Sequence, residues 1–318
     1  MLHHRPGQGM PTLVAQERME LNIMKDWFVK ILRSPRDGGK LAFNEHESSF
    51  SDGVNSYPVV GDIPVFLTAG KAEENHRKSD FDYAAHYRVD AEQIDYFRQR
   101  TDKLTATHLK MLRTSVMRQV PKTASTILDV GCGSAFVARQ FCRRGVKVVS
   151  LDIAQTNTEK AMQAVPSDNH AAVVADAFHL PFADNTFDCI IAAEIIEHTV
   201  DPQQFVVSLL AKLKPGGLLV LSTPYKEHIE YSLCIHCNCK TPHNAHLHSF
   251  DKESMRQIAR SASAQIRRMR LVGNKLLLRT HIVVPVAALG YRLWLLCDTL
   301  LNLVLPKAEH FFIVMAKE

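Results

Sequence analysis

The sequence predicts an α/β protein with a parallel, doubly wound sheet, because short apolar runs and amphipathic helical segments alternate from Thr126 onward. The apolar runs are TILDV, VKVVSLD, AAVVADA, FDCIIAAE and GGLLVLST. Between them, AFVARQFCRRG, NTEKAMQAV and PQQFVVSLLAKL have helical patterns, and we expect Gly145 to end the first and Pro202 to begin the last. In such sheets, ligands bind beyond the carboxyl ends of the strands.

The bulk composition is that of an ordinary globular protein. The chain has 318 residues, of which 46% are hydrophobic and 22% charged, so a buried core is expected. The net charge of +5 is mild and does not by itself indicate nucleic acid, so we expect no nucleic-acid partner. Residues 1–9 lack the apolar core of a signal peptide and the seven cysteines fit a reducing compartment, which together predict a cytoplasmic location.

Composition shifts divide the chain into four expected regions. These are a loose tail, a small β-rich module, a linker with a helical part, and the α/β domain, at residues 1–24, 25–69, 70–120 and 121–318. Within the α/β domain we expect an insertion at 226–250 and an apolar acceptor or lid region at 275–306.

Glycines and carboxylates follow the predicted strands where a ligand would bind. The first strand ends in ILDVGCGSA, where Gly131 and Gly133 let the backbone approach a ligand closely. Asp152 closes the second strand, where it can accept both ribose hydroxyls, and Asp176 closes the third, where it can accept from an adenine amino group. A nicotinamide dehydrogenase would need a third glycine, which is absent. The alternative for the acids is that they only cap strands and helices.

From residue 126 to 223 the chain resembles the class I S-adenosylmethionine-dependent methyltransferases, in particular those of the ubiquinone pathway and of sugars and natural products. The resemblance rests on LDVGCG, VVSLD, VVADA, FDCIIAAEIIEHTVDP and LKPGGLLVLSTP, with one departure at Ala135, where many members have a third glycine. It implies a Rossmann-like fold and S-adenosylmethionine as the cofactor. Carried over by position, the cofactor-binding residues would be Asp129, Gly131, Gly133, Asp152, Ile153, Asp176, Ala177 and Glu194.

Candidate catalytic groups follow the fourth and fifth strands. The cofactor supplies the reactive methyl group, so the protein mainly aligns the acceptor, and a base is needed only where the acceptor must lose a proton. His198 is the first candidate because imidazole titrates near neutrality, and Glu197 and Tyr225 are further candidates. A buried or capping histidine is the alternative for His198.

The implied function is methylation of a small molecule, with oxygen of an apolar, lipid-like or sugar-bearing acceptor expected as the target. The alternatives are methylation of carbon in a quinone-like ring, and a methyltransferase-fold scaffold protein without turnover. A homo-oligomer is a further expected form.

A cysteine and histidine cluster lies in the insertion, in YSLCIHCNCKTPHNAHLHSFD. Thiolate and imidazole at this spacing are typical zinc ligands, which predicts zinc at Cys234, Cys237, His243 and His246. The alternative is a set of ordinary buried cysteines and substrate-pocket histidines.

The N-terminal module resembles the small zinc-ribbon-like family that activates methyltransferases, in ILRSPRDGGKLAF and YPVVGDIPVFL. That family often has Cys-Pro-x-Cys where this chain has Ser34, Pro35, Arg36 and Asp37, so the module would not bind zinc through that pair. We expect the N-terminal module to serve as a docking or scaffold piece. A family-specific extension is the alternative.

The segment KLLLRTHIVVPVAALGYRLWLLCDTLLNLVLP is unusually apolar. Arg279, Arg292 and Asp298 interrupt it, and no run reaches the roughly 18 residues of a membrane span. Amphipathic helices that cover a lipid-like acceptor or make peripheral contact with a membrane are the functional interpretations, and burial against the core is the alternative. EHFFIVMAKE is then predicted as the last strand of the sheet.

Overall fold

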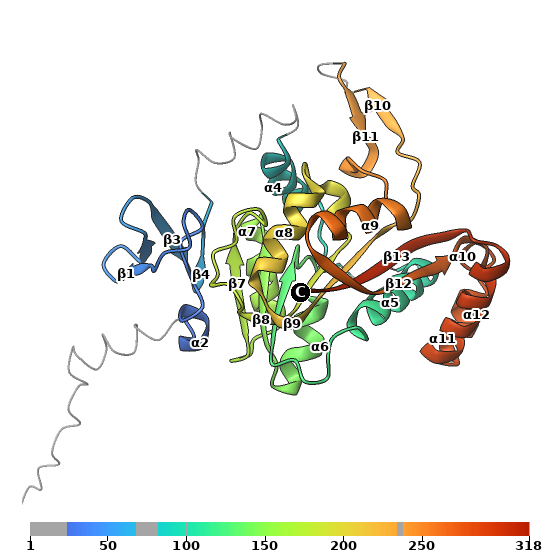
Figure 1. Cartoon of the computed structure of the whole chain (residues 1–318), viewed down its shortest axis with the longest axis horizontal. Helices are drawn as coiled ribbons and strands as arrows, with labels where there is room; N and C mark the ends of the chain where they lie inside the picture. The colour runs from blue at the N-terminus through green and yellow to red at the C-terminus, as the bar shows by residue number, and fades with distance from the viewer. Residues whose placement is uncertain (1–23, 68–81, 99–100, 234–237, 318) are drawn as a thin grey trace, which may run out of the picture.

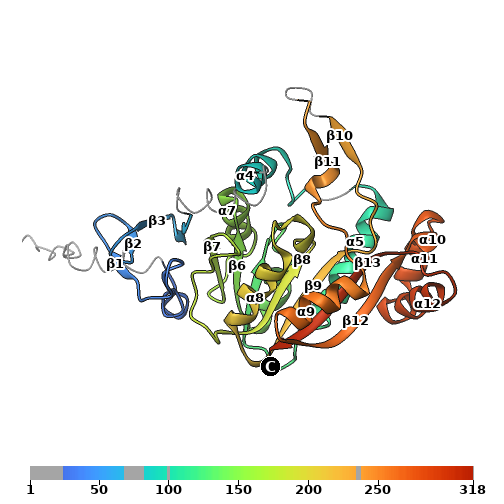
Figure 2. The same ribbon diagram turned by 45° about the horizontal axis from the view of Figure 1, so that its top comes forward.

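The computed structural model describes residues 24–67, 82–98, 101–233 and 238–317. A large twisted sheet with helices on both faces forms the body of the protein (Figure 1). A small sheet lies beside one edge of it and a group of short helices beside the other, as the turned view also shows (Figure 2). The predicted α/β class with a β-rich N-terminal part is therefore confirmed.

The large sheet has seven strands in the order β12-β13-β9-β8-β5-β6-β7. The strands are β5 Thr126–Val130, β6 Lys147–Asp152, β7 His170–Val174, β8 Phe187–Ala193, β9 Leu213–Pro224, β12 Ala264–Asn274 and β13 Ala308–Lys317. All five strands predicted from alternation are present and parallel, and the predicted last strand is β13. Because the chain runs outward from β5 in both directions, the switch point lies between β5 and β8.

One edge of the sheet differs from the predicted parallel arrangement, because β13 pairs antiparallel with both of its neighbours, β9 and β12. The sequence analysis did not predict β12. Its residues AQIRRMRLVGN include three arginines, and only the last three residues of the strand are buried. An edge strand with one solvated face lacks the continuous apolar run of a buried parallel strand.

Helices cover the two faces of the sheet and divide its core. The helices of the main body are α4 Tyr83–Gln93, α5 Lys103–Met117, α6 Phe136–Phe141, α7 Gln155–Ala164, α8 Pro202–Lys212 and α9 Lys252–Ser261, with short turns η1 Cys142–Arg144 and η2 Ile196–His198. Leu128 faces the cluster that contains α8 and α9, while its neighbour Ile127 faces the cluster that contains α5 and α6. Gly145 ends η1 with φ +77°, and Pro202 begins α8, both as predicted.

The N-terminal part forms a four-stranded antiparallel sheet that continues the large one. Its elements are α2 Asp26–Val29, β1 Ala42–Asn44, β2 Ser49–Ser51, β3 Ser56–Val60 and β4 Ile63–Pro64. Val65 pairs with Val174 at the end of β7, and the Phe66 N–H donates to the Val174 carbonyl at 2.8 Å. Trp27 and Lys25 donate to backbone carbonyls just before and at the start of β7. The small sheet therefore covers the edge of β7 that would otherwise be unpaired.

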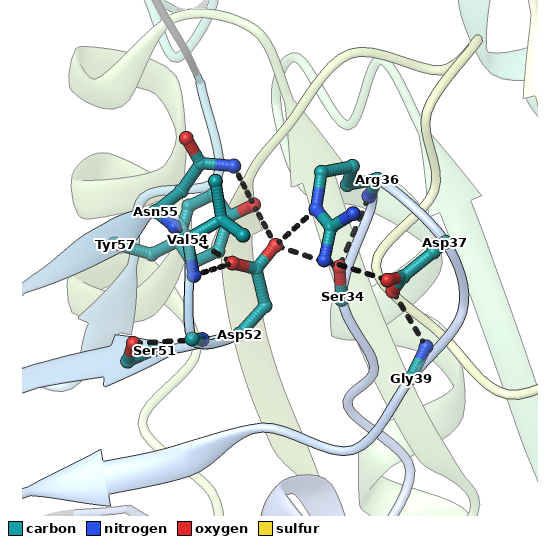
Figure 3. A network of polar contacts seen from close by, with 10 residues as sticks. Ser34, Arg36, Asp37, Gly39, Ser51, Asp52, Val54, Asn55 and Tyr57 are labelled. Carbon is teal, nitrogen blue, oxygen red and sulfur yellow. Dashed lines mark hydrogen bonds and ion pairs between the residues drawn. The ribbon is translucent and has the colours of Figure 1, made fainter.

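A polar network centred on Asp52 links Ser34, Arg36 and Tyr57 in the small sheet and the turn before it (Figure 3). The Asp52 carboxylate accepts hydrogen bonds from Ser34 Oγ and Tyr57 Oη, both at 2.9 Å, and forms an ion pair with Arg36 at 3.2 Å. Although burial acts to raise the pKa of Asp52, hydrogen bonds from the Asn55 and Val54 N–H groups and from these side chains hold it well below its usual range. A carboxylate that stays ionised thus joins the two turns of the module.

The C-terminal region adds a hairpin and a helical group. The hairpin strands are β10 Tyr231–Leu233 and β11 Lys240–Pro242, followed by η3 His243–Ala245. The helices α10 Lys275–Arg279, α11 Val283–Ala288 and α12 Tyr291–Val304 lie between β12 and β13. Among the described residues, no helix has the length and apolar character needed to cross a bilayer.

Candidate active site

A cavity of about 390 Å³ opens at the carboxyl ends of the parallel strands. The turns after β5, β6, β7 and β8 form one side, and α4 and α5 form the other. Its wall includes Tyr83, Tyr87, Leu109, Leu112, Gly131, Gly133, Ser134, Asp152, Ile153, Asp176, Ala177, Phe178, Glu194 and His198. The cavity therefore lies at the switch point that the strand order defines.

The glycine-rich turn forms the floor of the cavity. Gly131 and Gly133 have φ of +67° and +42°, in the left-handed region that favours glycine. A Cβ at Gly131 would lie 2.2 Å from Ile195 Cδ1, so the turn after β5 touches the turn after β8 there. Glycine is thus required at position 131 for the contact with Ile195 in the turn after β8, as well as for the close approach of any ligand.

Two buried acids flank this turn. Asp152 is 8% exposed and accepts from the Ala154 N–H at 3.0 Å and from Asn157 Nδ2 at 3.2 Å. Burial raises its pKa to about 6. Asp129 is 1% exposed, does not line the cavity, and its Oδ2 has no hydrogen-bond partner among the described residues. Burial, with the Asp152 carboxylate nearby, raises the pKa of Asp129 well above its usual range.

Asp176 lies at the third strand end in an aromatic corner. Tyr83 Oη donates to its Oδ2 at 2.5 Å, and the Phe178 N–H donates to its Oδ1 at 2.9 Å. The rings of Tyr83 and Phe178 pack edge to face, with centroids 6.3 Å apart. A carboxylate beside flat apolar surfaces suits a planar base with an amino group.

These residues fit the cofactor that the sequence resemblance implies. Asp152 and Asp176 are the acceptors that a ribose and an adenine amino group need, and both line the cavity. Ser134 Oγ is also on the wall, buried and without a partner among the described residues, beside the two glycines. It offers a polar contact for the amino-acid end of the cofactor.

Glu194 joins the cavity to a pair of histidines, His310 on β13 and His108 on α5. It has φ +57°, accepts from Ser222 Oγ at 2.7 Å, and lies 2.8 Å from His310 Nδ1. Burial acts to lower the pKa of His310, but the Glu194 carboxylate raises it above its usual value. The ring of His310 in turn lies 5.2 Å from the ring of His108 on α5.

His198 lies in the cavity wall and meets the insertion. Its Nδ1 is 2.6 Å from Tyr87 Oη, and its ring centroid is 4.7 Å from that of His246. Burial, together with His246, lowers the pKa of His198 to about 4, so the ring is neutral at neutral pH. Glu227 lies 2.5 Å from His246 Nδ1 and orients that second ring.

Glu197 is buried behind His198 rather than on the wall. It is 1% exposed, and both carboxylate oxygens lack hydrogen-bond partners among the described residues. Burial and the nearby Glu194 raise its pKa well above the usual range, which favours a neutral carboxyl group. Ligand-type atoms of Glu197, His198 and His246 lie within 4.8 Å of one another. The backbone carbonyl of Glu197 accepts hydrogen bonds from the N–H groups of Leu247 and His248, and these bonds tie the insertion to the turn after β8.

Tyr225 and His243, two further predicted residues, do not line the cavity. Tyr225 packs its ring 5.2 Å from that of Phe311, and it does not line the wall. His243 is in the hairpin, where it contacts Ser232 and Glu230. Cys234 and Cys237 lie outside the described residues.

The wall opposite the glycine turn was not predicted. It comes from α4 and α5, through side chains such as Tyr83, Tyr87, Leu109 and Leu112. We expected 275–306 to supply it, but no described residue after Ser222 lines this cavity. Tyr83 and Tyr87 share a helix face at i, i+4, which was the available signal.

Comparison with known proteins agrees with this geometry. Residues 128–221 match the family described as the methyltransferase domain. The ubiquinone biosynthesis O-methyltransferase of Rickettsia akari is 26% identical over 166 residues, covering 52% of this chain and 61% of that protein. The enzyme of the same name from Methylobacterium nodulans is 32% identical over 123 residues, covering 37% and 48%. This chain therefore spans less than two thirds of the length of either relative.

A solved structure supports the fold. The complex between the Haloferax volcanii Trm112 methyltransferase activator and a putative methyltransferase is similar with a TM-score of 0.50 and 16% identity. The similarity covers 75% of this chain and 97% of that chain. At this identity it supports the Rossmann-like arrangement alone.

We predict that Gly131→Ala lowers the free energy of unfolding by about 2–4 kcal/mol, because the new Cβ would both strain φ and collide with Ile195. Gly145→Ala is the matched control: its φ is +77° but nothing lies within 4 Å of the added Cβ, so about 1–2 kcal/mol is expected. Denaturant unfolding of the two variants measures the difference. Equal losses would show that the Ile195 contact does not constrain the turn.

Proposed function

We propose that this chain transfers a methyl group from S-adenosylmethionine to an oxygen of a small apolar acceptor, a proposal supported by the match of residues 128–221 to the methyltransferase-domain family. The observation that carries the proposal is the position of Asp152 and Asp176 on the wall of one cavity, at the ends of adjacent strands and beside the glycine turn. Nucleotide recognition at a switch point needs this combination.

Each cavity residue has a proposed role in holding the cofactor. Asp152 accepts the ribose hydroxyls and Ile153 packs beside them, while Asp176 and Ala177 face the adenine. Gly131, Gly133 and Glu194 border the amino-acid end, with Asp129 supporting the turn from behind. When bound, the cofactor supplies an electrophilic methyl group on sulfur. The chain's own residues orient the acceptor and exclude water.

The acceptor side favours an apolar, flat molecule. Tyr87 contributes a ring to the wall, and Leu109 and Leu112 contribute aliphatic surface, while Tyr83 and Phe178 border the Asp176 corner proposed for the adenine. Such a wall binds an aromatic or lipid-like acceptor better than an unmodified sugar. Methylation of a quinone-like ring at carbon remains the alternative reaction, and a scaffold without turnover the alternative function.

His198 is proposed as the general base. It is the imidazole on the cavity wall, and Tyr87 holds its Nδ1 side, which fixes the ring plane. An acceptor hydroxyl must lose its proton as the methyl group arrives, and a neutral imidazole can take it. Glu197 supports the turn, and the position of Tyr225 makes it a packing residue rather than a proton acceptor.

Zinc is a separate proposal for the insertion. It is supported by the thiols and histidines between residues 234 and 248, and by His246, which reaches the cavity side and contacts His198. A metal there would fix the insertion over the acceptor.

The N-terminal sheet is proposed as a docked module at residues 25–69 that supports the β7 end of the cofactor site.

We predict that Asp152→Asn weakens S-adenosylmethionine binding by about 10- to 100-fold, since a hydrogen bond to a charged group contributes about 1.5–3 kcal/mol. Wild-type affinity should also fall as the pH drops below about 6, because Asp152 then takes up a proton, whereas the variant should not respond. Calorimetry over this pH range measures both. The exposed Asp184→Asn is the control, and unchanged affinity in Asp152→Asn would exclude the ribose contact.

We predict that His198→Ala lowers the rate of methyl transfer by about 10²- to 10⁴-fold, the usual contribution of a general base, with cofactor affinity unchanged. Transfer of labelled methyl groups to a panel of simple phenols and catechols measures the rate. His46→Ala, in the small sheet, is the control. If the variant keeps the wild-type rate, His198 is not the general base and its role is structural.

We predict that the purified full chain carries bound zinc, and that Cys234→Ser/Cys237→Ser loses it while Cys297→Ser keeps it. Elemental analysis of the wild type and the two variants measures the zinc bound to each. Metal-free wild type would exclude the zinc proposal. Retention of zinc by the double variant would exclude the thiols as ligands.

A further inference from the structure

The helical group at the C-terminal side exposes a continuous apolar face. Leu293, Leu296, Leu300 and Leu303 follow at spacings of three and four residues, so they share one side of α12, and Leu289 lies just before the helix. Their exposed fractions lie between 40% and 76%. The same region has further exposed apolar side chains on α10, before α11, at the end of α12 and just after it; they are Leu276, Ile282, Val304 and Leu305.

The orientation of α12 is fixed, so the leucines cannot turn inward. Trp294, Asp298 and Asn302 form the opposite, buried side of the helix. Asp298 accepts from the N–H groups of Gly273 and Asn274 at the end of β12, at 3.2 and 2.6 Å. Rotating the helix would break these hydrogen bonds and would expose Trp294, which is fully buried. The apolar face is therefore a stable surface of the folded chain.

The exposed Lys and Arg side chains of the segment that carries this face, residues 275–308, have no exposed acid among them. Between residues 275 and 308 the exposed charged side chains are Arg279, Arg292 and Lys307, with Lys275 half-buried. The single acid of that stretch is Asp298, which is buried and points away from the face. Two copies packed face to face would bring these cations together. An anionic surface complements them instead.

The length of α12 suits a surface helix. Its 14 residues extend about 21 Å at 1.5 Å per residue, short of the roughly 30 Å of a bilayer core. An apolar side flanked by Arg and Lys is typical of a helix that lies in the headgroup region.

We propose that the exposed face of α10, α11 and α12 docks this protein on the surface of an anionic lipid bilayer. The leucines enter the boundary between headgroups and acyl chains, and Arg279, Arg292 and Lys307 pair with lipid phosphates. The face lies one helix away from the cavity: Tyr291 Oη donates to Ser115 Oγ of α5 at 3.0 Å, and the next turns of α5, at Leu112 and Val116, line the cavity. If the proposed methyl transfer holds, docking brings the apolar acceptor side close to a lipid reservoir.

Vesicle flotation of the full-length protein tests this proposal. Wild type should float with vesicles of phosphatidylcholine and phosphatidylglycerol, bind pure phosphatidylcholine much less, and dissociate as salt is added. Arg279→Gln/Arg292→Gln/Lys307→Gln should bind about 100-fold more weakly, since each basic residue near the surface contributes about fivefold. Leu296→Gln/Leu300→Gln should lose at least about tenfold through reduced apolar burial.

Matched controls are available on the small sheet and elsewhere. Val54 and Val60 are also exposed apolar residues, so Val54→Gln/Val60→Gln should bind vesicles like wild type. Lys40→Gln/Arg143→Gln removes exposed cations far from the face and should have little effect. Thermal unfolding checks that each variant is folded. Asp152→Asn should bind vesicles normally, which separates this proposal from that of cofactor binding.

Two results would overturn the proposal. One is wild type that stays with the soluble fraction at low salt in the presence of anionic vesicles. The other is a concentration-dependent dimer in sedimentation velocity that Leu296→Gln/Leu300→Gln abolishes, without vesicle binding by wild type; this would assign the face to a second copy of the chain.

Discussion

The contact between Ile195 and Gly131 constrains more of the site than any other. It presses the turn after β8 against the turn after β5 with no room for a Cβ between them. The first turn carries Glu194, Glu197 and His198, and the second forms the floor of the cavity. The side that suits a nucleotide and the side that carries the histidines therefore have a fixed separation. Gly131 and Glu194, one in each of these turns, both have a positive φ.

Much of the fold could be predicted from local sequence. Strands β5 to β9 are buried on both faces, so they read as apolar runs, and Gly145 and Pro202 mark helix ends by their own conformational preferences. The order of Asp152 and Asp176 along the chain was enough to place both at the strand ends. Strand β12 escaped prediction because its arginines face solvent and its partner β13 is far along the chain.

The acceptor side of the site could not be predicted, because it depends on contacts between distant segments. Tyr83 meets Asp176 across 93 positions and Tyr87 meets His198 across 111. The i, i+4 spacing of Tyr83 and Tyr87 indicates a shared helix face, but nothing in the local sequence indicates that this face lies over the cavity. Apolar character alone suggested 275–306 for that role, yet those helices pack on the outer side of α5 and present their leucines to the outside. Composition thus identified an unusual segment but not which way it faces.

The pairing of Val65 and Phe66 with β7 also determines which proteins can assemble here. Because the small sheet and β7 belong to the same chain, they meet at an effective concentration of about millimolar, so their pairing is not lost on dilution. The two parts are necessarily made in equal number, and no separate subunit has to be found. Because Val65 and Phe66 already pair with Val174, a strand from another protein would have to displace them before it could add to this end of β7.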